Sequence, residues 1–586
     1  MTFDDDVAAQ DLSTEEEAIT YEAGKTQLTI INQPEASLEE TELKVLLELT
    51  GSGENEDRSP VDIVMVLDIS GSMKEENRIG KLKIAMQFLI QKLSPIDRLS
   101  VVTFSTGSER LFQLRQITND SQLEIIEKVN GLSAGGWTNM FDGLKTGVQV
   151  LKDRRFNRGR LGAIILMSDG DQTDRFGDAR QVPVGIFAVH TFGFGSDAKP
   201  EVLKEIAEKS NGGTFSNVRD VNDLTKAFSQ CLGGLLTVVV KDLNLTVTQF
   251  KDESTIKDVS AGNYPKTAND SSVTVSFGEL YNSEVRLAMA YILLPKADEE
   301  KDPDVIKVAY NYSSGKGKQF KAPPVTANVN RRRTATVKEI PRLILEENRL
   351  RALNSVKEAR VLADNSELER AKNVVDEAKN TLERVKVDDP TELIKTLIYE
   401  LQQISDFMTT KDVYEKKGRS YAMSFETSHE RQRYAARGDM DKVRSFATPR
   451  MNAYLDQAKK FDTDPSTPPP TEKEDLTKDP KPPIIEQPPA EPPFFITIFN
   501  QVLKFLDDLL KFITGHVELV GTKDDPPATR RTWIGRSRKA DISLQQRGTH
   551  AERERRASGR ARERNSRLDW RVQWSRMRGS WAGEEA

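Results

Sequence analysis

The 586-residue sequence has one cysteine, Cys231, and only four histidines. A single cysteine excludes an intrachain disulfide, a zinc ribbon and a Cys-x-x-Cys redox pair. No run of about 18 or more apolar residues is present, so we expect no transmembrane helix. Residues 1–22 are acidic and lack the apolar stretch of a signal peptide. These absences predict a protein of a reducing compartment, in the cytoplasm or the nucleus.

The sequence also lacks a large excess of either positive or negative charge. The 85 Lys and Arg residues nearly balance the 91 Asp and Glu residues, which leaves a net charge of −6. This balance argues against nucleic-acid binding by the chain as a whole. A chain of this length is too long for one hydrophobic core, so we expect about two to four domains.

A shift in pattern near Val61 indicates a central α/β domain. Near-continuous apolar runs of strand length are separated by segments of helix length, and a last helix-like segment closes the unit. Such alternation is typical of a doubly wound, mostly parallel sheet with helices on both faces. The apolar runs are 62–67, 99–104, 163–168 and 184–192, and the helical segments are 79–93, 121–130, 140–153, 199–210 and 220–233.

Short alternating strands on both sides of this domain predict an antiparallel β-sandwich. We expect the early strands to join the later ones, so that the α/β domain is an insertion in, or is flanked by, the sandwich. The predicted segments in order are a disordered acidic lead (1–24), the first sandwich strands (25–56), the α/β domain (60–235), the remaining sandwich strands (236–332), a helical hairpin or small bundle (338–461), a Pro-rich linker (462–493), an amphipathic helix (494–514) and a disordered Arg-rich tail (515–586).

The last three segments leave alternatives open. The linker contains 11 prolines, which is typical of a stiff, solvated connection. The helix of residues 494–513 could lie on a membrane surface, but its balanced charges favour packing on the folded part or in a partner groove. The tail, with fifteen Arg from residue 530 onward, could contact RNA or acidic surfaces, or could result from a shifted reading frame. We favour disorder without a dedicated function.

The stretch Asp68-Ile69-Ser70-Gly71-Ser72 follows the first apolar run of the α/β domain. Ligands of an open parallel sheet bind beyond the carboxyl ends of its strands. Two more loops at that edge offer Thr138, in a Gly-rich turn, and Asp169, directly after another strand. Carboxylate and hydroxyl oxygens suit Mg²⁺, Mn²⁺ or Ca²⁺. The sequence therefore predicts one metal site formed by Asp68, Ser70, Ser72, Thr138 and Asp169.

This ligand set has only two formal negative charges, so it neutralises a divalent cation weakly. A carboxylate of a partner protein could then complete the coordination. Helix capping alone would explain Asp68 and the serines but would leave Thr138 and Asp169 unexplained. Asp142 could accept a hydrogen bond from a metal ligand or could simply be an acid favoured at a helix start.

Other candidate residues have simpler explanations. Asp171 and Asp174 lack the glycine and glutamate spacing of an EF-hand, so we expect solvated loop acids. His190 lies in a predicted strand and is expected to be a hydrogen-bonded interior residue. Cys231 is expected to be a small buried hydrophobe. No Walker loop or dinucleotide-binding motif is present, so no cofactor other than the metal is expected.

Asp68-x-Ser70-x-Ser72, Gly-Gly-x-Thr138 and Ser168-Asp169-Gly170 together resemble the metal-ion-dependent adhesion site of a von Willebrand factor type A domain. The flanking segments 418–439 and 446–465 resemble plant proteins with this domain. Some of these plant proteins are RING-type E3 ubiquitin ligases, and others are described by analogy to inter-alpha-trypsin inhibitor heavy chains. A RING needs several cysteines, and this sequence has one.

The resemblance implies a protein that is not an enzyme and that binds acidic groups of a protein partner through the metal. The alternative is a substrate-binding component of a ubiquitin ligase pathway without a RING of its own. Hydrolysis at the metal lacks a candidate general base and is the weakest hypothesis. The sequence does not identify the partner, the preferred ion or the oligomeric state.

Overall fold

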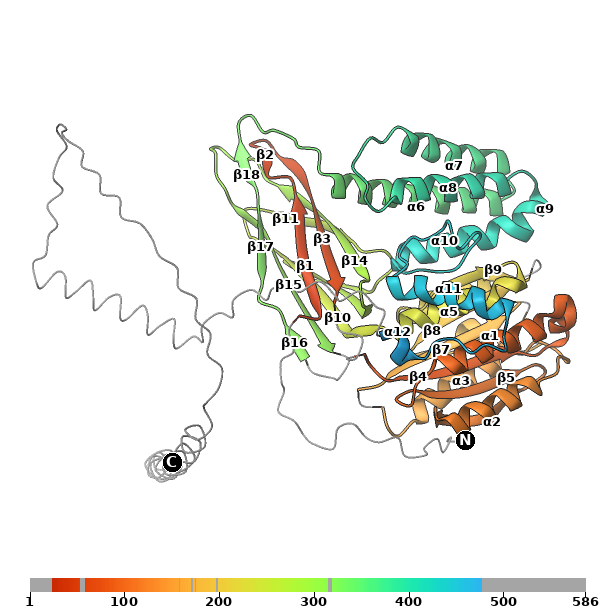
Figure 1. Cartoon of the computed structure of the whole chain (residues 1–586). Coiled ribbons are helices and arrows are strands. Elements are labelled where there is room, and N and C mark those ends of the chain that lie inside the picture. The colour runs from red at the N-terminus through yellow and green to blue at the C-terminus, as the bar shows by residue number, and fades with distance from the viewer. Residues whose placement is uncertain are drawn as a thin grey trace, which may run out of the picture. The chain divides into compact units, whose positions relative to one another are not determined.

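The computed structural model describes residues 24–52, 58–157, 159–169, 172–173, 175–195, 199–314 and 319–476 (Figure 1). All of these residues belong to one compact unit within residues 1–490. The acidic lead up to residue 23, the segments 494–514 and 515–586, and Asp171 and Asp174 lie outside the described residues. No described helix is both long enough and apolar enough to cross a membrane.

The α/β domain contains a six-stranded sheet with the order β6-β5-β4-β7-β8-β9. Five strands run parallel and β6 is an antiparallel edge strand. The mostly parallel sheet expected from the sequence is thus confirmed, with two strands, β6 and β9, that the apolar pattern missed. The strands are β4 (Val61–Asp68), β5 (Arg98–Phe104), β6 (Ser108–Gln116), β7 (Leu161–Ser168), β8 (Ala188–Phe194) and β9 (Phe215–Val218).

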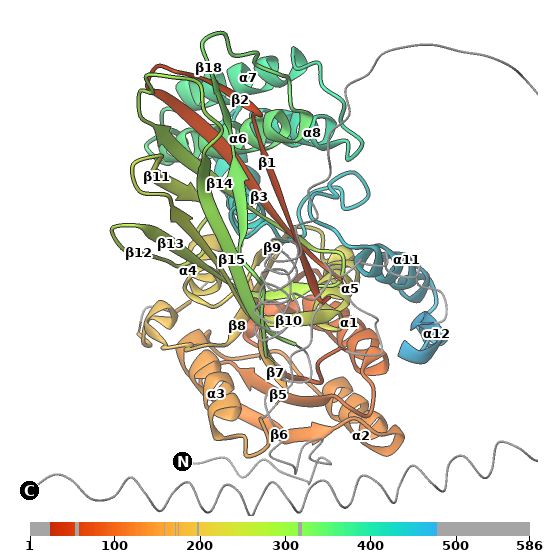
Figure 2. The same ribbon diagram turned by 90° about the vertical axis from the view of Figure 1, so that its left-hand side faces the viewer.

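Helices cover both faces of this sheet, as Figure 2 shows. Every residue of β4 is buried, because its alternate side chains enter two separate cores. Met65 packs with residues of α1, α2 and α5, and Val66 packs with residues of α3 and α4. This two-sided burial explains the continuous apolar run. The helices are α1 (Arg78–Lys92), α2 (Asn119–Asn130), α3 (Met140–Asp153), α4 (Pro200–Lys209) and α5 (Leu224–Leu235).

Strand β8 begins at Ala188, four residues after the start of the predicted run 184–192. Gly185 has a φ of +66°, and the side chain of Ile186 is 78% exposed. These residues form a solvent-facing turn, because a positive φ breaks the extended backbone. The prediction for this end of the strand was wrong.

Strands from before and after the α/β domain share one sheet of a β-sandwich. β3 pairs with β14 along their whole lengths, from Thr41 opposite Leu294 to Thr50 opposite Val285. The insertion of the α/β domain in the sandwich is confirmed by this pairing. The first sheet contains β1 (Thr26–Asn32), β3 (Thr41–Gly51), β14 (Val285–Leu294) and β11 (Thr255–Ser260). The second contains β12 (Lys266–Ala268), β13 (Ser272–Tyr281), β10 (Val238–Gln249), β15 (Asp304–Ser314), β16 (Gln319–Lys321) and β17 (Val325–Asn328), and β2 (Glu35–Ser37) pairs with β18 (Asn330–Arg332).

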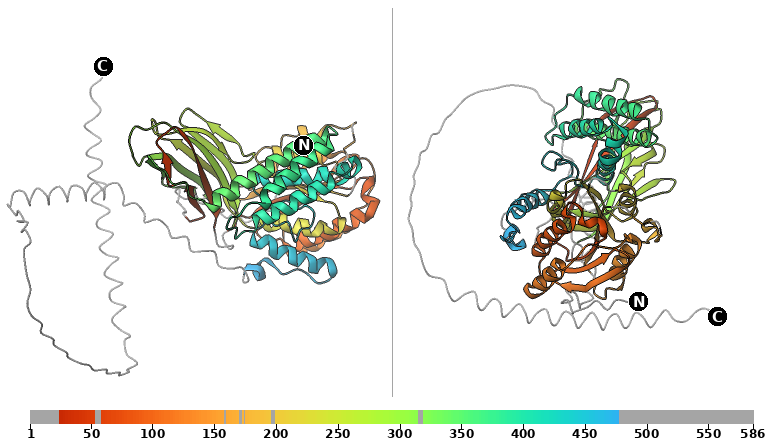
Figure 3. Two further views of the ribbon diagram at one scale, coloured as in Figure 1. Left: turned by 90° about the horizontal axis from the view of Figure 1, so that it is seen from above. Right: turned by 90° about the vertical axis from the view of Figure 1, so that its right-hand side faces the viewer.

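The C-terminal helices divide into two groups. Helices α6, α7 and α8 pack around a core that one side of α10 joins through Tyr421, Ala422 and Phe425, whereas α11 packs on the α/β domain, which α10 contacts as well. Figure 3 shows α11 and α12, in blue, beside that domain. The helices are α6 (Pro341–Asp364), α7 (Leu368–Glu383), α8 (Leu393–Phe407), α9 (Lys411–Val413), α10 (Arg419–Arg431), α11 (Pro449–Thr463) and α12 (Glu472–Leu476), with a π-helical turn at Tyr414–Gly418.

The chain that follows α10 joins three parts of the molecule. Arg431 donates a hydrogen bond to the backbone carbonyl of Ser210 in the α/β domain, at 3.1 Å. Gln432 and Leu287 of the sandwich exchange two hydrogen bonds of 2.6 and 2.8 Å. Ala436 donates to Ser216 Oγ and accepts from the amide of Asn217, along the edge of β9. Helix α10 is therefore buried between the α6–α8 core and the α/β domain.

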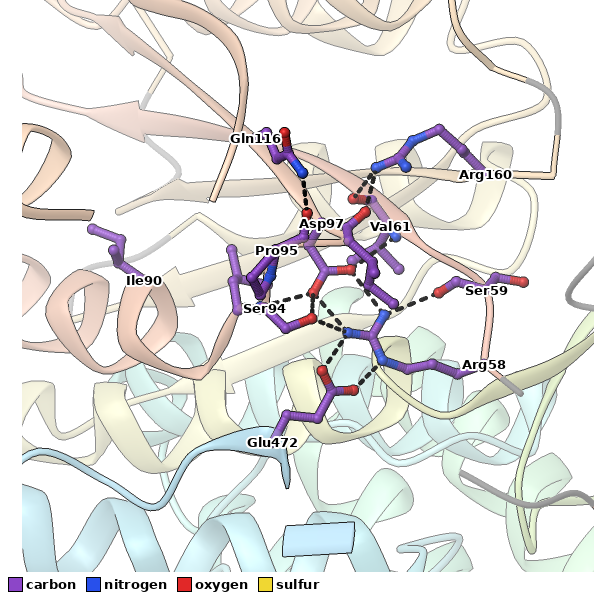
Figure 4. Close-up of polar contacts among 12 residues, drawn as sticks. Arg58, Ser59, Val61, Ile90, Ser94, Pro95, Asp97, Gln116, Arg160 and Glu472 are labelled. Carbon is purple, nitrogen blue, oxygen red and sulfur yellow. Dashed lines mark hydrogen bonds and ion pairs between the residues drawn. The ribbon is translucent and has the colours of Figure 1, made fainter. Parts of the chain in front are cut away.

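An ion network closes the end of the sheet where the strands begin (Figure 4). Arg58, which leads into β4, donates to both carboxylate oxygens of Asp97, at 2.8 and 2.7 Å. The same guanidinium binds Glu472 of α12 at 2.8 Å. Lys92 lies 2.5 Å from Asp475, also in α12. These pairs hold α12 against the start of the α/β domain.

Candidate metal site

The three predicted loops meet at the opposite end of the sheet, where the strands finish. The amide of Gly71 donates to the carbonyl of Gly136 at 3.1 Å, and the amide of Gly135 donates to the carbonyl of Ile69 at 2.8 Å. The third loop is joined in the same way, because the amide of Thr173 donates to the carbonyl of Thr138 at 3.1 Å. Backbone hydrogen bonds thus connect all three loops.

Asp68 is the last residue of β4, and its side chain is fully buried. Its Oδ1 accepts a hydrogen bond from the amide of Ser70 at 2.8 Å, and its Oδ2 accepts one from the hydroxyl of Ser168 at 2.7 Å. These bonds fix the orientation of the carboxyl group at the end of the strand.

Asp169 follows β7, the neighbour of β4, and is also buried. Burial and the nearby carboxylate of Asp169 together raise the pKa of Asp68 to about 7, against the hydrogen bonds from Ser168 and Ser70. The two buried carboxyl groups therefore lie close enough to repel each other when both are ionised. A cation between them would stabilise the ionised pair. Arg78 Nη1 lies 3.3 Å from Asp169 Oδ2.

The hydroxyl groups come from two loops. Ser70 Oγ and Ser72 Oγ lie 3.1 Å apart, and Ser70 is buried. Thr138 is buried as well, and its amide donates to Thr173 Oγ1 at 3.2 Å. Gly136, two residues earlier, has a φ of +87°, and a Cβ there would lie 2.9 Å from Thr106 Oγ1. Only glycine fits this turn without strain.

The donor set consists of carboxylate and hydroxyl oxygens on loops that are bonded to each other. Such hard donors fit Mg²⁺, Mn²⁺ or Ca²⁺ better than zinc or copper. In the part of the chain that the structure describes, no cluster of three or more His, Cys, Asp or Glu side chains could hold a metal. The five residues named from the sequence remain the candidate ligands, and their occupancy by a metal is a prediction.

Sequence reasoning missed two side chains that contact this site. Ser168 directly precedes Asp169 in the Ser168-Asp169-Gly170 motif, and this position could have indicated that it contacts the site. Arg78 gave no signal, because its approach depends on the path of the loop before α1. Asp142 accepts a hydrogen bond from Asn139 Nδ2 at 2.7 Å, and its amide donates to Asn139 Oδ1. These contacts favour the interpretation of Asp142 as an acid of the helix start.

The sequence predicts that His190 and Cys231 are interior residues. His190 is buried and contacts Thr214 Oγ1 at 3.0 Å. Burial lowers the pKa of His190 to about 3, with a smaller effect of Arg433, so the ring is neutral at pH 7. Cys231 packs against the core of the α/β domain but is only partly buried, less than the sequence led us to expect, and desolvation raises the pKa of its thiol to about 12.

An exposed aromatic side chain lies next to the candidate ligands. Trp137, directly before Thr138, is 55% exposed. The guanidinium of Arg175, from the loop after β7, lies 4.4 Å from the centre of the Trp137 ring. We call Trp137 and Arg175 the rim pair.

Comparisons with known proteins agree with this geometry. Residues 62–230 match the model of the von Willebrand factor type A domain, and residues 391–460 match a family described as VWA / Hh protein intein-like. The E3 ubiquitin-protein ligase WAV3 of Arabidopsis thaliana is 27% identical over 59% of this chain and 46% of its own length. The inter-alpha-trypsin inhibitor heavy chain H3 of Mesocricetus auratus is 28% identical over 39% of this chain and 26% of its own length.

The chain thus spans less than half the length of either of these curated relatives. A solved structure, the von Willebrand factor type A protein from Catenulispora acidiphila, has the same fold over 70% of this chain and 97% of its own, with a TM-score of 0.52 and 17% identity. The α/β domain of this chain, over residues 62–230, is a von Willebrand factor type A domain.

Proposed function

We propose that this chain is a non-enzymatic interaction protein that binds an acidic side chain of a partner protein through a divalent cation. Asp68, Ser70, Ser72, Thr138 and Asp169 would hold the cation, most simply Mg²⁺. When bound, the cation supplies a positive centre with a coordination position open to an outside carboxylate. The two charged ligands, Asp68 and Asp169, are buried and would hold the cation in place at the ends of their strands.

The observation that carries the proposal is the pair of buried carboxyl groups, Asp68 and Asp169, at the ends of adjacent parallel strands. Bringing two acids together in a buried place costs free energy, and natural proteins keep such pairs where a cation or a reaction uses them. Three hydroxyls in the bonded loops supply neutral oxygen donors. Among the described residues no cluster of three or more His, Cys, Asp or Glu side chains could hold a metal, so the candidate site depends on hydroxyl oxygens as well as carboxylates.

The rim pair supports a protein partner in particular. Trp and Arg are the residues that most often dominate the free energy of protein–protein contacts. Trp137 offers a broad apolar ring, and Arg175 offers a guanidinium for a second acidic group. A partner segment with a carboxylate on the metal would therefore cover Trp137 as well.

The test is capture of partners from extract by the immobilised full chain, in Mg²⁺ or in EDTA, with the captured proteins identified by mass spectrometry. We expect a set of proteins that is retained in Mg²⁺ and released by EDTA. The double variant Asp68→Ala with Ser70→Ala should lose that set, and the control Asp120→Ala, in the first turn of α2, should keep it. Retention of the same proteins in EDTA would contradict the metal bridge.

A second function is favoured by one observation, the similarity to WAV3 over 59% of this chain. In this view the chain binds substrates in a ubiquitin ligase pathway. A reconstituted mixture of E1, E2 and ubiquitin tests whether the chain itself promotes ubiquitin transfer. Transfer by the chain alone would contradict the non-enzymatic function.

A further inference from the structure

Arg78, the first residue of α1, is a buried cation that faces the candidate metal site. Its side chain is 1% exposed, and Nη1 lies 3.3 Å from Oδ2 of Asp169. Its Nη2 lies 3.5 Å from Glu76 and 3.8 Å from Glu75, whose side chains are 50% and 64% exposed. Water screens those two exposed pairs, whereas the contact with Asp169 joins two buried side chains.

The backbone directly before Arg78 is strained. Glu76 and Asn77 are consecutive non-glycine residues with left-handed conformations, at φ values of 48° and 56°. Each such residue costs about 1 kcal/mol or more, so the surrounding structure must hold it. Met73, fully buried, anchors the segment on one side. On the other side the amide group of Asn77 packs where a Cβ of Gly80 would be, at 2.4 Å.

The guanidinium of Arg78 lowers the net negative charge of the candidate metal site. Asp68 and Asp169 carry two negative charges at most, and the guanidinium neutralises one of them. A divalent cation on the same carboxylates would lie within a few Å of the guanidinium, where like charges repel strongly in a buried place. The cation and Arg78 therefore compete for Asp169.

We propose that Arg78 is an intramolecular counter-ion that competes with the divalent cation for Asp169 and so sets the metal affinity of the site. The proposal rests on the metal site of the proposed function and deepens it. With Arg78 in place the site binds its metal weakly, which leaves the bound ion with more positive charge to share with a partner carboxylate.

The variant Arg78→Gln keeps a polar side chain of similar length and removes the charge. We expect the full-length variant, stripped of metal, to bind Mg²⁺ at least about tenfold more tightly than the wild type in isothermal titration calorimetry at pH 8, because removing the guanidinium removes a like charge beside the cation. Arg78→Lys keeps the charge and should bind within about threefold of the wild type. The matched control is Arg115→Gln, which removes a half-buried arginine paired with Glu124 far from the three loops and should leave the Mg²⁺ affinity unchanged.

A second readout separates competition from damage to the fold. In EDTA, Arg78→Gln should melt at a lower temperature than the wild type, because Asp68 and Asp169 repel each other without a cation. Saturating Mg²⁺ should remove this difference in melting temperature, because the metal replaces the lost positive charge.

If the wild type binds no Mg²⁺, the proposed function fails. If the wild type binds Mg²⁺ and Arg78→Gln binds it no more tightly, the proposed function stands and the role of Arg78 is refuted.

Discussion

Arg433 and Glu284 form a two-point ion pair in the interior of the molecule, from Nε to Oε1 at 3.0 Å and from Nη2 to Oε2 at 3.2 Å. Arg433 lies in the chain after α10, and Glu284 lies in the turn between β13 and β14 of the sandwich. The same guanidinium donates to the carbonyl of Gly212 in the α/β domain at 2.9 Å. One side chain thus joins three parts of the chain. Burial alone would raise the pKa of Glu284, but Arg286 and Arg433 outweigh burial and hold that pKa below its usual value.

Replacing Arg433 by Met should destabilise the fold by about 3–5 kcal/mol, because Glu284 and two carbonyls would lose a buried partner. Differential scanning calorimetry of the full chain measures the effect as a fall in melting temperature. Arg115→Met, which breaks an exposed pair with Glu124, should cost less than about 1 kcal/mol. If both variants lowered the melting temperature by the same small amount, the contacts of Arg433 would not be important for stability.

The stability should also depend on pH through Glu279. Burial raises the pKa of Glu279 to about 7, although Arg433 lowers it in part. Since the folded-state pKa lies above the ordinary value of 4.5, the stabilising contribution is complete below about pH 4.5 and is lost as pH rises through 7. The wild type should therefore lose stability relative to Glu279→Gln between pH 5 and about pH 8.5, by a few kcal/mol at most. Melting curves of both proteins at several pH values test this, and parallel profiles would refute it.

Gly136 should be needed for the geometry of the metal site. Gly136→Ala places a Cβ 2.9 Å from Thr106 Oγ1 at a φ of +87°, which displaces the turn that carries Thr138. We expect about tenfold weaker Mg²⁺ binding by calorimetry and a loss of about 1 kcal/mol of stability or more. Gly107→Ala is the matched control in a neighbouring loop, because a Cβ there meets no atom within 4 Å. Normal Mg²⁺ binding by Gly136→Ala would show that the turn does not position a ligand.

Trp137 should contribute to partner binding without contributing to metal binding. Trp137→Ala removes the exposed ring under Arg175 and should weaken capture of the Mg²⁺-dependent partners by about tenfold or more, as expected for a central interface residue. Its Mg²⁺ affinity should equal that of the wild type. Leu123→Ala, at a 71% exposed position on α2, is the control. Unchanged capture by Trp137→Ala would place the partner surface elsewhere.

The sequence predicted the elements whose burial leaves a simple pattern. Strands β4 and β7 are buried on both faces, so residues 63–67 and 163–167 are continuously apolar. The edge strand β6, with the sequence SERLFQLRQ, is mostly half-buried and of mixed polarity, so the search for continuous apolar runs does not find it. That strands before and after the α/β domain share one sandwich was expected, because the two ends of an inserted domain lie close together; the sequence did not indicate that β3 would pair with β14.

The candidate site could be predicted in part for a related reason. Asp68 and Asp169 end adjacent parallel strands, and adjacent strand ends meet at one edge of a sheet. Arg78 could not be predicted, because two left-handed residues before it turn its side chain inward and neither is glycine. The packing of α10 was equally hidden, since it depends on contacts such as Arg433 with Glu284 that are 149 residues apart.

An anomalous difference map of crystals grown with Mn²⁺ tests the central claim most directly. We predict one strong peak between Asp68 and Asp169, with the hydroxyls of Ser70, Ser72 and Thr138 around it, and no peak there in crystals of Asp169→Asn. A map without a peak at the ends of β4 and β7, or with the same peak in Asp169→Asn, would contradict the metal site and the function proposed from it.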